Sequence, residues 1–284
     1  PGANDIATGS VYLILESTAT LPCSSPDIDT MQLTIQLLPL ADAGPDATIC
    51  EDATYTIPGS AQNQSSVLWT TTGDGSFNNN TILGAEYTPG ANDIASGTVY
   101  LILESTATLP CGSPAIDTMQ LTIQWLPLAD AGPDATICED ATYIIPGSAQ
   151  NQSAVLWTTS GDGNFDDATI LGAEYTPGAN DITTGSVYLI LESTATLPCG
   201  SAAIDTMQLT IQLLPLANAG PDATICEDAT YTLPGSAQNQ SAVLWTTTGD
   251  GTFDDATILG ATSTPGTNDK ITGAVDLILE STAT

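Results

Sequence analysis

Six cysteines are the residues in this chain most able to form covalent bonds, and they recur at a fixed spacing. Two series have members 88 positions apart: Cys23, Cys111 and Cys199, and Cys50, Cys138 and Cys226. Two cysteines in each small repeated unit favour disulfides over metal binding or thiol chemistry, if the chain is exported. The spacing therefore predicts disulfides that recur along the chain.

Three pairings are compatible with the sequence. Pairing within a repeat gives the disulfide cysteines Cys50 with Cys111 and Cys138 with Cys199, while Cys23 and Cys226 pair outside this sequence. Pairing Cys23 with Cys50 would use all six cysteines. Pairing Cys50 with Cys199 would staple the loop after the first strand of one repeat to the loop before the last strand of the next. Within-repeat pairing is slightly favoured, and disulfide geometry decides, since α-carbons must lie within ~7 Å.

Side-chain oxygens at alternate positions of a recurring turn resemble a calcium-binding loop. The candidate ligands are Asp74, Asn78, Asp162, Asn164, Asp166, Asp250 and Asp254. The junction acids Asp42, Asp46, Glu51 and Asp52 form a second candidate cluster. Because the glycine and distal glutamate of an EF-hand are missing, a polar hairpin turn with Phe165 in the core is the simpler interpretation. Calcium is the only cofactor that the sequence suggests.

The composition excludes several classes of function. The chain has 33 acidic residues, one lysine, no arginine and no histidine, for a net charge of −32. Nucleic acids and anionic membranes are excluded as partners, because both are bound through Lys and Arg. An enzyme is not expected, because histidine is absent as a base and no cationic pair can hold an oxyanion. Cations must balance the charge, which fits a saline or calcium-rich exterior.

Internal repetition sets the domain organisation. The stretches 41–128 and 129–216 differ at few positions, so we expect two complete repeats there. The stretches 1–40 and 217–284 match the C-terminal part and the N-terminal part of a repeat. We expect a longer array around this sequence, and no signal peptide or transmembrane run is visible within it.

Short strands separated by turns are predicted throughout each repeat. In residues 41–128 we expect strands at 47–50, 54–57, 67–71, 81–83, 86–88, 98–106 and 119–126, with turns at 73–75 and 89–93. No helical periodicity is present. This pattern predicts an all-β fold of tandem immunoglobulin-like antiparallel β-sandwiches, with Trp69 in the core.

The stretch 119–138 joins one repeat to the next and occurs three times. Its first half alternates, with Met119, Leu121, Ile123 and Trp125 on one side, as in a half-buried strand. Pro127 and Pro133 then restrict the short joint. We therefore expect the tandem domains to form an elongated rod.

The runs AGPDATICEDATYTI, VLWTTTGDG, YTPGANDI, VYLILESTATLPC and DTMQLTI resemble the immunoglobulin-like, PKD-like repeats of very large Bacteroidetes cell-surface adhesins. The repeats of the gliding-motility adhesins that the type IX secretion system exports are the nearest likeness. The resemblance implies an extracellular, cell-surface stalk or filament that serves adhesion, with neighbouring repeats and surface or glycan targets as partners. The alternative is a self-assembling matrix or sheath fibre, in which copies of the chain pack laterally or exchange strands.

The same resemblance suggests a modification. Asp-Thr-Met resembles the O-glycosylation signal of Bacteroidetes proteins, which would place glycans on Thr30, Thr118 and Thr206. A polar strand entry explains the three residues equally well. Asn63, Asn151 and Asn239 lie in Asn-Gln-Ser, an N-glycan acceptor only where the host has that machinery.

Overall fold

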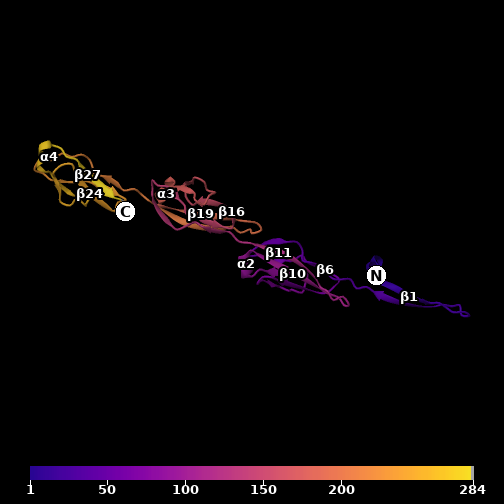
Figure 1. Cartoon of the computed structure of the whole chain (residues 1–284). Helices are drawn as coiled ribbons and strands as arrows, with labels where there is room; N and C mark the ends of the chain where they lie inside the picture. Colours follow the sequence, from indigo (N-terminus) through magenta and orange to yellow (C-terminus); the bar gives the residue numbers. More distant parts are fainter. Residues whose placement is uncertain (283–284) are drawn as a thin grey trace. The chain divides into compact units, whose positions relative to one another are not determined.

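The structure is a computed structural model that describes residues 1–282. It divides into two compact units, shown in sequence colours in Figure 1. Unit 1 comprises Pro1–Leu128, Asn151–Ser153 and Thr194–Ala203, and unit 2 comprises Ala129–Gln150, Ala154–Ser193 and Ile204–Thr284. The limits at 40, 128 and 216 expected from the sequence stay predictions, and we keep the word repeat for those sequence segments.

The second repeat (41–128) is built from ten strands and helices. They are β3 (Leu40–Asp42), β4 (Ala47–Cys50), β5 (Tyr55–Thr56), β6 (Ser60–Gln62), β7 (Gln64–Thr71), β8 (Ser76–Phe77), β9 (Glu86–Thr88), α2 (Ala91–Ser96), β10 (Thr98–Ala107) and β11 (Ala115–Gln124). Its sheets have the orders β4-β11-β10-β7, β5-β9-β8 and β3-β6. The prediction of an all-β fold of immunoglobulin-like sandwiches is confirmed.

One strand pair departs from the antiparallel arrangement that we expected. β4 runs parallel to β11, with Ala47 opposite Leu121 and Cys50 opposite Gln124. β11 is antiparallel to β10, and β10 is antiparallel to β7. β4 enters from the joint before the repeat and forms the edge of the sheet, so its only ladder partner is the last strand of the repeat.

A one-turn helix, α2, replaces the turn that we expected at 89–93. The six-residue element is too short to produce a helical hydrophobic period, which is why the sequence did not reveal it. Gly97 ends the helix at φ 73°, a left-handed conformation that favours glycine, and its N–H donates to the carbonyl of Asp93 at 3.0 Å. The expected strand at 81–83 is also absent, since those residues form turns.

The third repeat (129–216) has the same sheet orders: β13-β20-β19-β16, β14-β18-β17 and β12-β15. Its elements are β12 (Leu128–Asp130), β13 (Ala135–Cys138), β14 (Tyr143–Ile144), β15 (Ser148–Gln150), β16 (Gln152–Thr159), β17 (Asn164–Phe165), β18 (Glu174–Thr176), α3 (Ala179–Thr184), β19 (Ser186–Ala195) and β20 (Ala203–Gln212).

The first and fourth repeats contain fewer elements. Residues 1–40 form α1 (Ala3–Thr8), β1 (Ser10–Ser17) and β2 (Asp27–Thr34). Residues 217–282 form β22 (Tyr231–Thr232), β23 (Ser236–Gln238), β24 (Ala242–Thr247), β25 (Thr252–Phe253), β26 (Thr262–Thr264), α4 (Thr267–Thr272) and β27 (Leu277–Thr282), preceded by β21 (Leu216–Asn218). Among residues 1–282, no helix has the length and apolar character needed to cross a membrane.

Each complete repeat has a core around one tryptophan. Trp69, predicted to be internal, is fully buried in a cluster with Leu101, Leu103, Met119 and Leu121. Alternate residues of β10 and β11 face this core because side chains point to opposite faces of a strand in turn. Trp125, expected to continue that face, lies after the end of β11 and is 40% exposed.

This core predicts how one strand residue affects stability. Leu101→Ala should lower the free energy of unfolding of the second repeat by about 2–5 kcal/mol, because it leaves a cavity beside Trp69. Leu68→Ala, at a 39% exposed position on β7, should cost far less. Hydrogen exchange of peptides covering β10 measures both values, and equal effects would contradict this description of the core.

Candidate functional site

A disulfide joins Cys50, at the end of β4, to Cys199, in the loop between β19 and β20. The α-carbons lie 4.8 Å apart, and both residues belong to unit 1. Both side chains are buried, at 7% and 2% exposure. The bridge is the third of the pairings that the sequence left open, so the favoured pairs Cys50–Cys111 and Cys138–Cys199 are wrong.

The parallel pairing of β4 explains the error. Cys50 lies opposite Gln124, at the C-terminal end of β11, whereas Cys111 precedes the N-terminal end of that strand. A ten-residue strand spans about 33 Å, so the two cysteines of one repeat are far beyond bonding distance. The sequence could have revealed this only if the direction of β4 had been known.

The loop that carries Cys199 is seated by polar contacts with the joint. Asn151 has a left-handed backbone, with φ 60°, and its Nδ2 donates to the carbonyl of Leu126 at 3.1 Å. Thr196 Oγ1 donates to the carbonyl of Asn151 at 3.3 Å. Cys199 Sγ lies 3.3 Å from the carbonyl oxygen of Gln124. These contacts hold the loop against the end of β11, where Cys50 lies.

The preceding joint, also within unit 1, has the same arrangement without the bridge. Asn63 Nδ2 donates to the carbonyl of Leu38 at 3.1 Å, and Thr108 Oγ1 donates to the carbonyl of Asn63 at 3.3 Å. Cys111 Sγ lies 3.4 Å from the carbonyl oxygen of Gln36. Cys111 is a free thiol in the position that Cys199 occupies in its disulfide. The joint contacts therefore form without the covalent bond.

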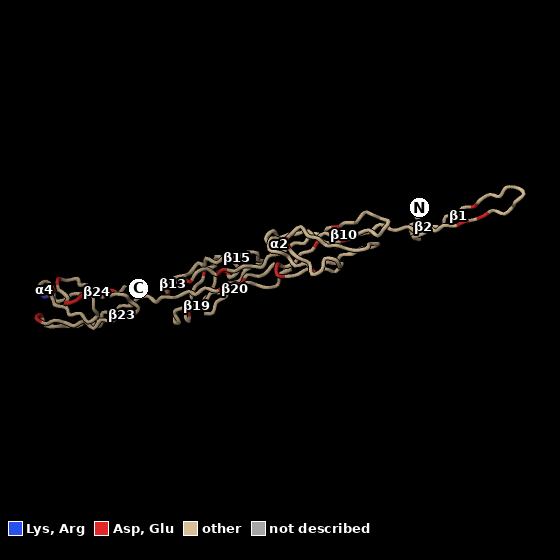
Figure 2. Tube along the Cα trace, turned by 90° about the horizontal axis from the view of Figure 1, so that it is seen from below, with Lys and Arg blue, Asp and Glu red and all other residues tan. Residues whose placement is uncertain are grey.

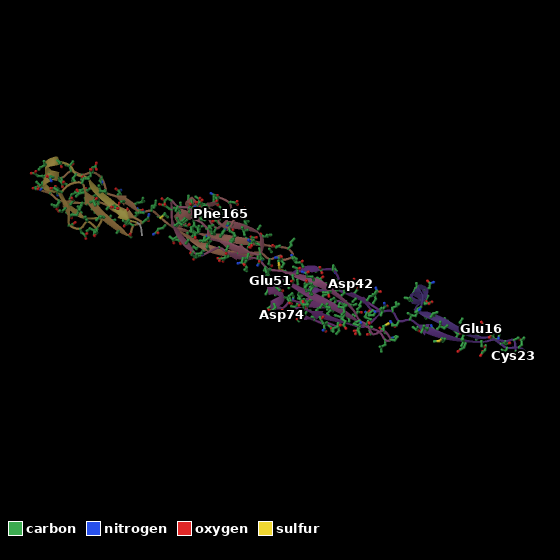
Figure 3. All side chains as sticks on the ribbon, viewed as in Figure 1. Glu16, Cys23, Asp42, Glu51, Asp74 and Phe165 are labelled. Atoms are coloured by element: carbon green, nitrogen blue, oxygen red, sulfur yellow. A yellow bond between two sulfur atoms is a disulfide. The ribbon has the colours of Figure 1, made fainter. Side chains whose placement is uncertain are left out.

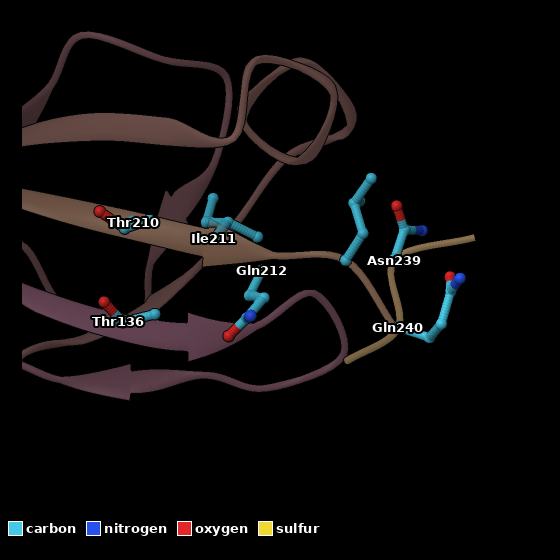
Figure 4. A pocket seen from close by; sticks show the side chains of 7 residues that line it. Thr136, Thr210, Ile211, Gln212, Asn239 and Gln240 are labelled. Carbon is cyan, nitrogen blue, oxygen red and sulfur yellow. The ribbon is translucent and has the colours of Figure 1, made fainter. Parts of the chain in front are cut away.

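In unit 2, the asparagine contact of the joint is repeated. Asn239 Nδ2 donates to the carbonyl of Leu214 at 3.1 Å, as at the other joints. Beside it lies a pocket of about 480 Å³ lined by Thr136, Gln212, Asn239 and Gln240 among others (Figure 4). Gln212 lies opposite Cys138, an exposed free thiol, in the β13–β20 ladder.

Acidic side chains at the joints accept hydrogen bonds from backbone N–H groups. In unit 1, Asp117 Oδ2 accepts from Ala43 N at 2.7 Å, and Asp46 Oδ1 accepts from Gln120 N at 2.7 Å. Glu51, labelled in Figure 3, accepts from Leu126 N at 3.2 Å. The junction acids thus fasten the edge strand and the joint to β11. Asp42 accepts locally, from Gly44 N at 2.9 Å.

A second acidic network links the turn after β7 to helix α2. Asp93 is 2% exposed, and its carboxylate accepts from Tyr87 Oη at 2.6 Å, Gly75 N at 3.0 Å and Gly90 N at 3.0 Å. Asp74 Oδ1 accepts in turn from Asn92 N at 3.1 Å. Asp74 N also donates to Asp93, so three backbone donors and one hydroxyl can replace the water that this buried carboxylate loses.

These contacts shift two pKa values. Burial raises the pKa of Asp93, but the hydrogen bonds from Tyr87 and the backbone N–H groups outweigh it, and the net pKa lies below the usual range. Burial, followed by the hydrogen bond to Asp93, raises the pKa of Tyr87 to about 12. Asp181 and Tyr175 repeat both shifts in the third repeat. The glycine before the turn is required, because a Cβ at Gly73 would lie 1.6 Å from Asp93 Oδ1.

The candidate calcium ligands lie on or beside this turn, and most of them accept hydrogen bonds from backbone N–H groups, in two different places. Asp74, Asp162 and Asp250 accept from the first backbone N–H groups of helices α2, α3 and α4. Asn78, Asp166 and Asp254 accept from residues 86, 174 and 262 across a hairpin. Asn164 is an exposed residue of β17, and Phe165 packs at 5.0 Å from Tyr175. In residues 1–282, no group of three or more His, Cys, Asp or Glu is placed to hold a metal ion.

The candidate glycosylation residues Thr30, Thr118 and Thr206 are all exposed. Asp117, which precedes Thr118, accepts a hydrogen bond from Ala43 N at 2.7 Å. Asp205, which precedes Thr206, accepts one from Ala131 N at 2.8 Å. The asparagines of Asn-Gln-Ser use their Nδ2 atoms in the joints. Structural roles thus account for Asp117, Asp205 and the three asparagines of these motifs.

No known protein family and no characterised protein sequence matches this chain. Among solved structures, protocadherin gamma B7 extracellular cadherin domains 1–4 are similar at 13% identity and a TM-score of 0.47, over 99% of this chain and 84% of that one. Human CDH23 EC21–23 is similar at 11% identity and a TM-score of 0.45, over 81% and 90%. DIP-gamma IG1+IG2 is similar at 13% identity and a TM-score of 0.39, over 62% and 99%.

The buried aspartates predict a pH dependence. Because their folded pKa lies below the unfolded value, Asp93 and Asp181 contribute stability that is present above about pH 4 and is lost as pH falls through the folded pKa. The doubly substituted variant Asp93→Asn with Asp181→Asn should be less stable than the parent at pH 7, and the difference should shrink in acid. Urea unfolding at several pH values measures this, with Asp140→Asn, an exposed position, as control. A difference independent of pH would contradict it.

The disulfide predicts a specific result of peptide mapping. Without reduction, the peptides containing Cys50 and Cys199 should be linked, and Cys199→Ser should lower the stability of the folded state by about 2–4 kcal/mol. Cys111→Ser, which removes a free thiol in the same loop position, is the matched control and should have little effect on an isolated chain. A Cys50–Cys111 peptide would contradict the structure.

Proposed function

We propose that this chain is a structural repeat region, a stalk or filament, of a large exported cell-surface adhesin, and that it holds adhesive parts away from the cell. Three features support the proposal: tandem β-sandwiches, joints built from repeated contacts, and a composition without the usual catalytic bases. The sequence resemblance adds the finer proposals of type IX secretion and of a role in gliding. It also suggests an elongated rod with surface or glycan targets at other parts of the protein.

The observation that carries the proposal is the connectivity of the disulfide. Cys50 and Cys199 are 149 positions apart, so the bridge closes a covalent loop around most of the second and third repeats. Tension applied along the chain passes from Cys50 through the bridge to Cys199. Residues 51–198 then carry no tension through their backbone and cannot be extended. A spacer that must transmit force outside the cell benefits from this bypass.

We also propose that calcium and glycans bind to this repeat region. Acidic residues occur throughout the described chain, and the one basic side chain is that of Lys270, within α4 (Figure 2). The mutual repulsion of these charges is reduced by salt or by bound cations. Calcium would act here by neutralising carboxylates, and glycans on Thr30, Thr118 and Thr206 would cover an exposed part of β2, β11 and β20.

Single-molecule stretching of the whole chain from its two ends tests this function. Reduction of the disulfide should add roughly 500 Å to the fully extended length, since residues 51–198 become extensible at about 3.3–3.6 Å each. Cys50→Ser should show the longer length with or without reductant, whereas Cys111→Ser should behave as the parent. If reduction leaves the extended length of the parent unchanged, the bypass does not exist and the proposed spacer loses its main support.

A further inference from the structure

The outer face of the four-stranded sheet in the second repeat is almost uncharged. β4, β11, β10 and β7 turn alternate residues toward the core, so the residues between them point to solvent. Within these four described strands, Glu104 is the one carboxylate that points outward, because Asp117 is directed to Ala43 on the inner side. The whole chain has 33 acidic residues. The other acids of this repeat therefore lie away from the outer face.

An exposed tyrosine lies near the middle of this face. Tyr100 of β10 is 47% exposed and lies opposite Gln120 of β11. On its other side, Thr72 Oγ1 accepts a hydrogen bond from Tyr100 N at 3.1 Å. Polar side chains thus border an aromatic ring that has one surface open to solvent.

Hydroxyl groups cross the sheet in rows on either side of this tyrosine. In one row, Thr48, Thr122 and Thr98 are adjacent on β4, β11 and β10. In the other row, Thr118 and Thr70 lie on the two strands that flank β10. Neighbouring strands are about 4.8 Å apart, so hydroxyl groups recur at short intervals across the face. An aromatic ring between such rows matches a sugar, which has apolar C–H faces and hydroxyl groups at its edge.

The third repeat has the same face within unit 2. Tyr188 of β19 is 51% exposed, and Ser160 Oγ accepts a hydrogen bond from its backbone N at 3.0 Å. Thr136 of β13 lies opposite Thr210 of β20, as in the row of threonines described above. The face therefore recurs with the period of the repeats.

The size and charge of the face disfavour a protein partner. Three strand spacings give a width of about 14 Å, and the steps from Thr98 to Thr106 along β10 give a length of about 27 Å. A protein docked there would bury about 800 Å² on both partners together, whereas stable interfaces bury at least about 1,200 Å². A second copy of this chain would also bring a second net charge of −32.

We propose that the outer sheet face of each complete repeat binds an uncharged polysaccharide, with Tyr100 and Tyr188 stacking on sugar rings. Charge sets the class of sugar. An anionic polysaccharide is repelled by the net charge of −32, whereas an uncharged one meets a nearly uncharged face without an electrostatic cost. A cationic polymer would be held at the joints and turns, where the carboxylates lie. The open, flat face suits an extended chain of sugars.

Repetition of the face compensates for the weak binding of one open surface. A polymer that reaches two faces makes its second contact as an intramolecular event, which raises the overall affinity without a new kind of contact. The proposal goes beyond a spacer, because it places an adhesive contact on the repeats themselves.

Retention of the complete 284-residue polypeptide on insoluble polysaccharides tests the proposal. The probes are cellulose, starch granules and agarose beads, which are uncharged. The polypeptide is produced without glycans, because Thr118 lies on the face and a glycan there would occupy it. The parent should be retained on at least one probe, and equally at low salt and in about 1 M NaCl, because no charged groups meet at the contact.

Three tyrosine substitutions made together test the face itself. Tyr12→Ala, Tyr100→Ala and Tyr188→Ala should weaken retention at least about tenfold by removing the stacking rings, and Tyr12 is included because it has the equivalent place on β1. Phenylalanine at the same three positions keeps the rings and should preserve retention. Trp125→Leu is the matched control, since this 40% exposed residue lies after β11 and the third repeat has Leu213 there.

Several results would overturn the proposal. They are no retention on any of the three probes, retention that the alanine variant keeps although its circular dichroism matches the parent, and retention lost in about 1 M NaCl, where the Debye length is about 3 Å. Sedimentation without polysaccharide tests a second copy as the occupant. A mass that rises with concentration in the parent but not in the alanine variant would assign the face to self-association instead. None of these results depends on the disulfide, so they are independent of the stretching experiment.

Discussion

The structure depends on how its carboxylates find partners in a chain with one lysine, no arginine and no histidine. Ion pairs are nearly unavailable, and the acids instead accept hydrogen bonds from backbone N–H groups and hydroxyls. Asp93 is the extreme case, since it is buried and accepts from a tyrosine and three backbone donors. Charge-assisted bonds of this kind are stronger than those between neutral groups. Acidic residues here hold the fold together rather than only keep it soluble.

The same acids make the edge strand β4 the meeting point of core and joint. Asp46 and Glu51 flank β4 and accept from backbone N–H groups at Gln120 and Leu126, on either side of the parallel ladder. This fixes Cys50 at the end of β11, where the loop of Cys199 rests. The ladder, the carboxylates and the disulfide are therefore parts of one arrangement.

Much of the fold could be predicted because apolar and polar residues alternate clearly in the strands, and because the same pattern recurs in each repeat. Trp69, β7, β9 and β10 were predicted close to their observed places. Helix α2 was missed because a helix of one turn shows no hydrophobic period in the sequence. The feature that could have revealed it is the pairing of Asp74 with Asp93, 19 residues apart. The disulfide was left open because sequence gives spacing but not strand direction. A parallel β4 reverses which end of the repeat Cys50 occupies.

The spacing of the bridge relative to the repeat has a mechanical consequence. Its ends are 149 positions apart, whereas the cysteines recur every 88. If each pair of repeats were bridged as Cys50 and Cys199 are, each covalent loop would begin before the previous one had closed. Overlapping loops leave no stretch of backbone between bridges to carry tension alone, whereas loops confined to single repeats leave every joint as such a stretch. The parallel edge strand makes the overlapping arrangement possible, because it places the first cysteine of a repeat beside the next repeat's loop.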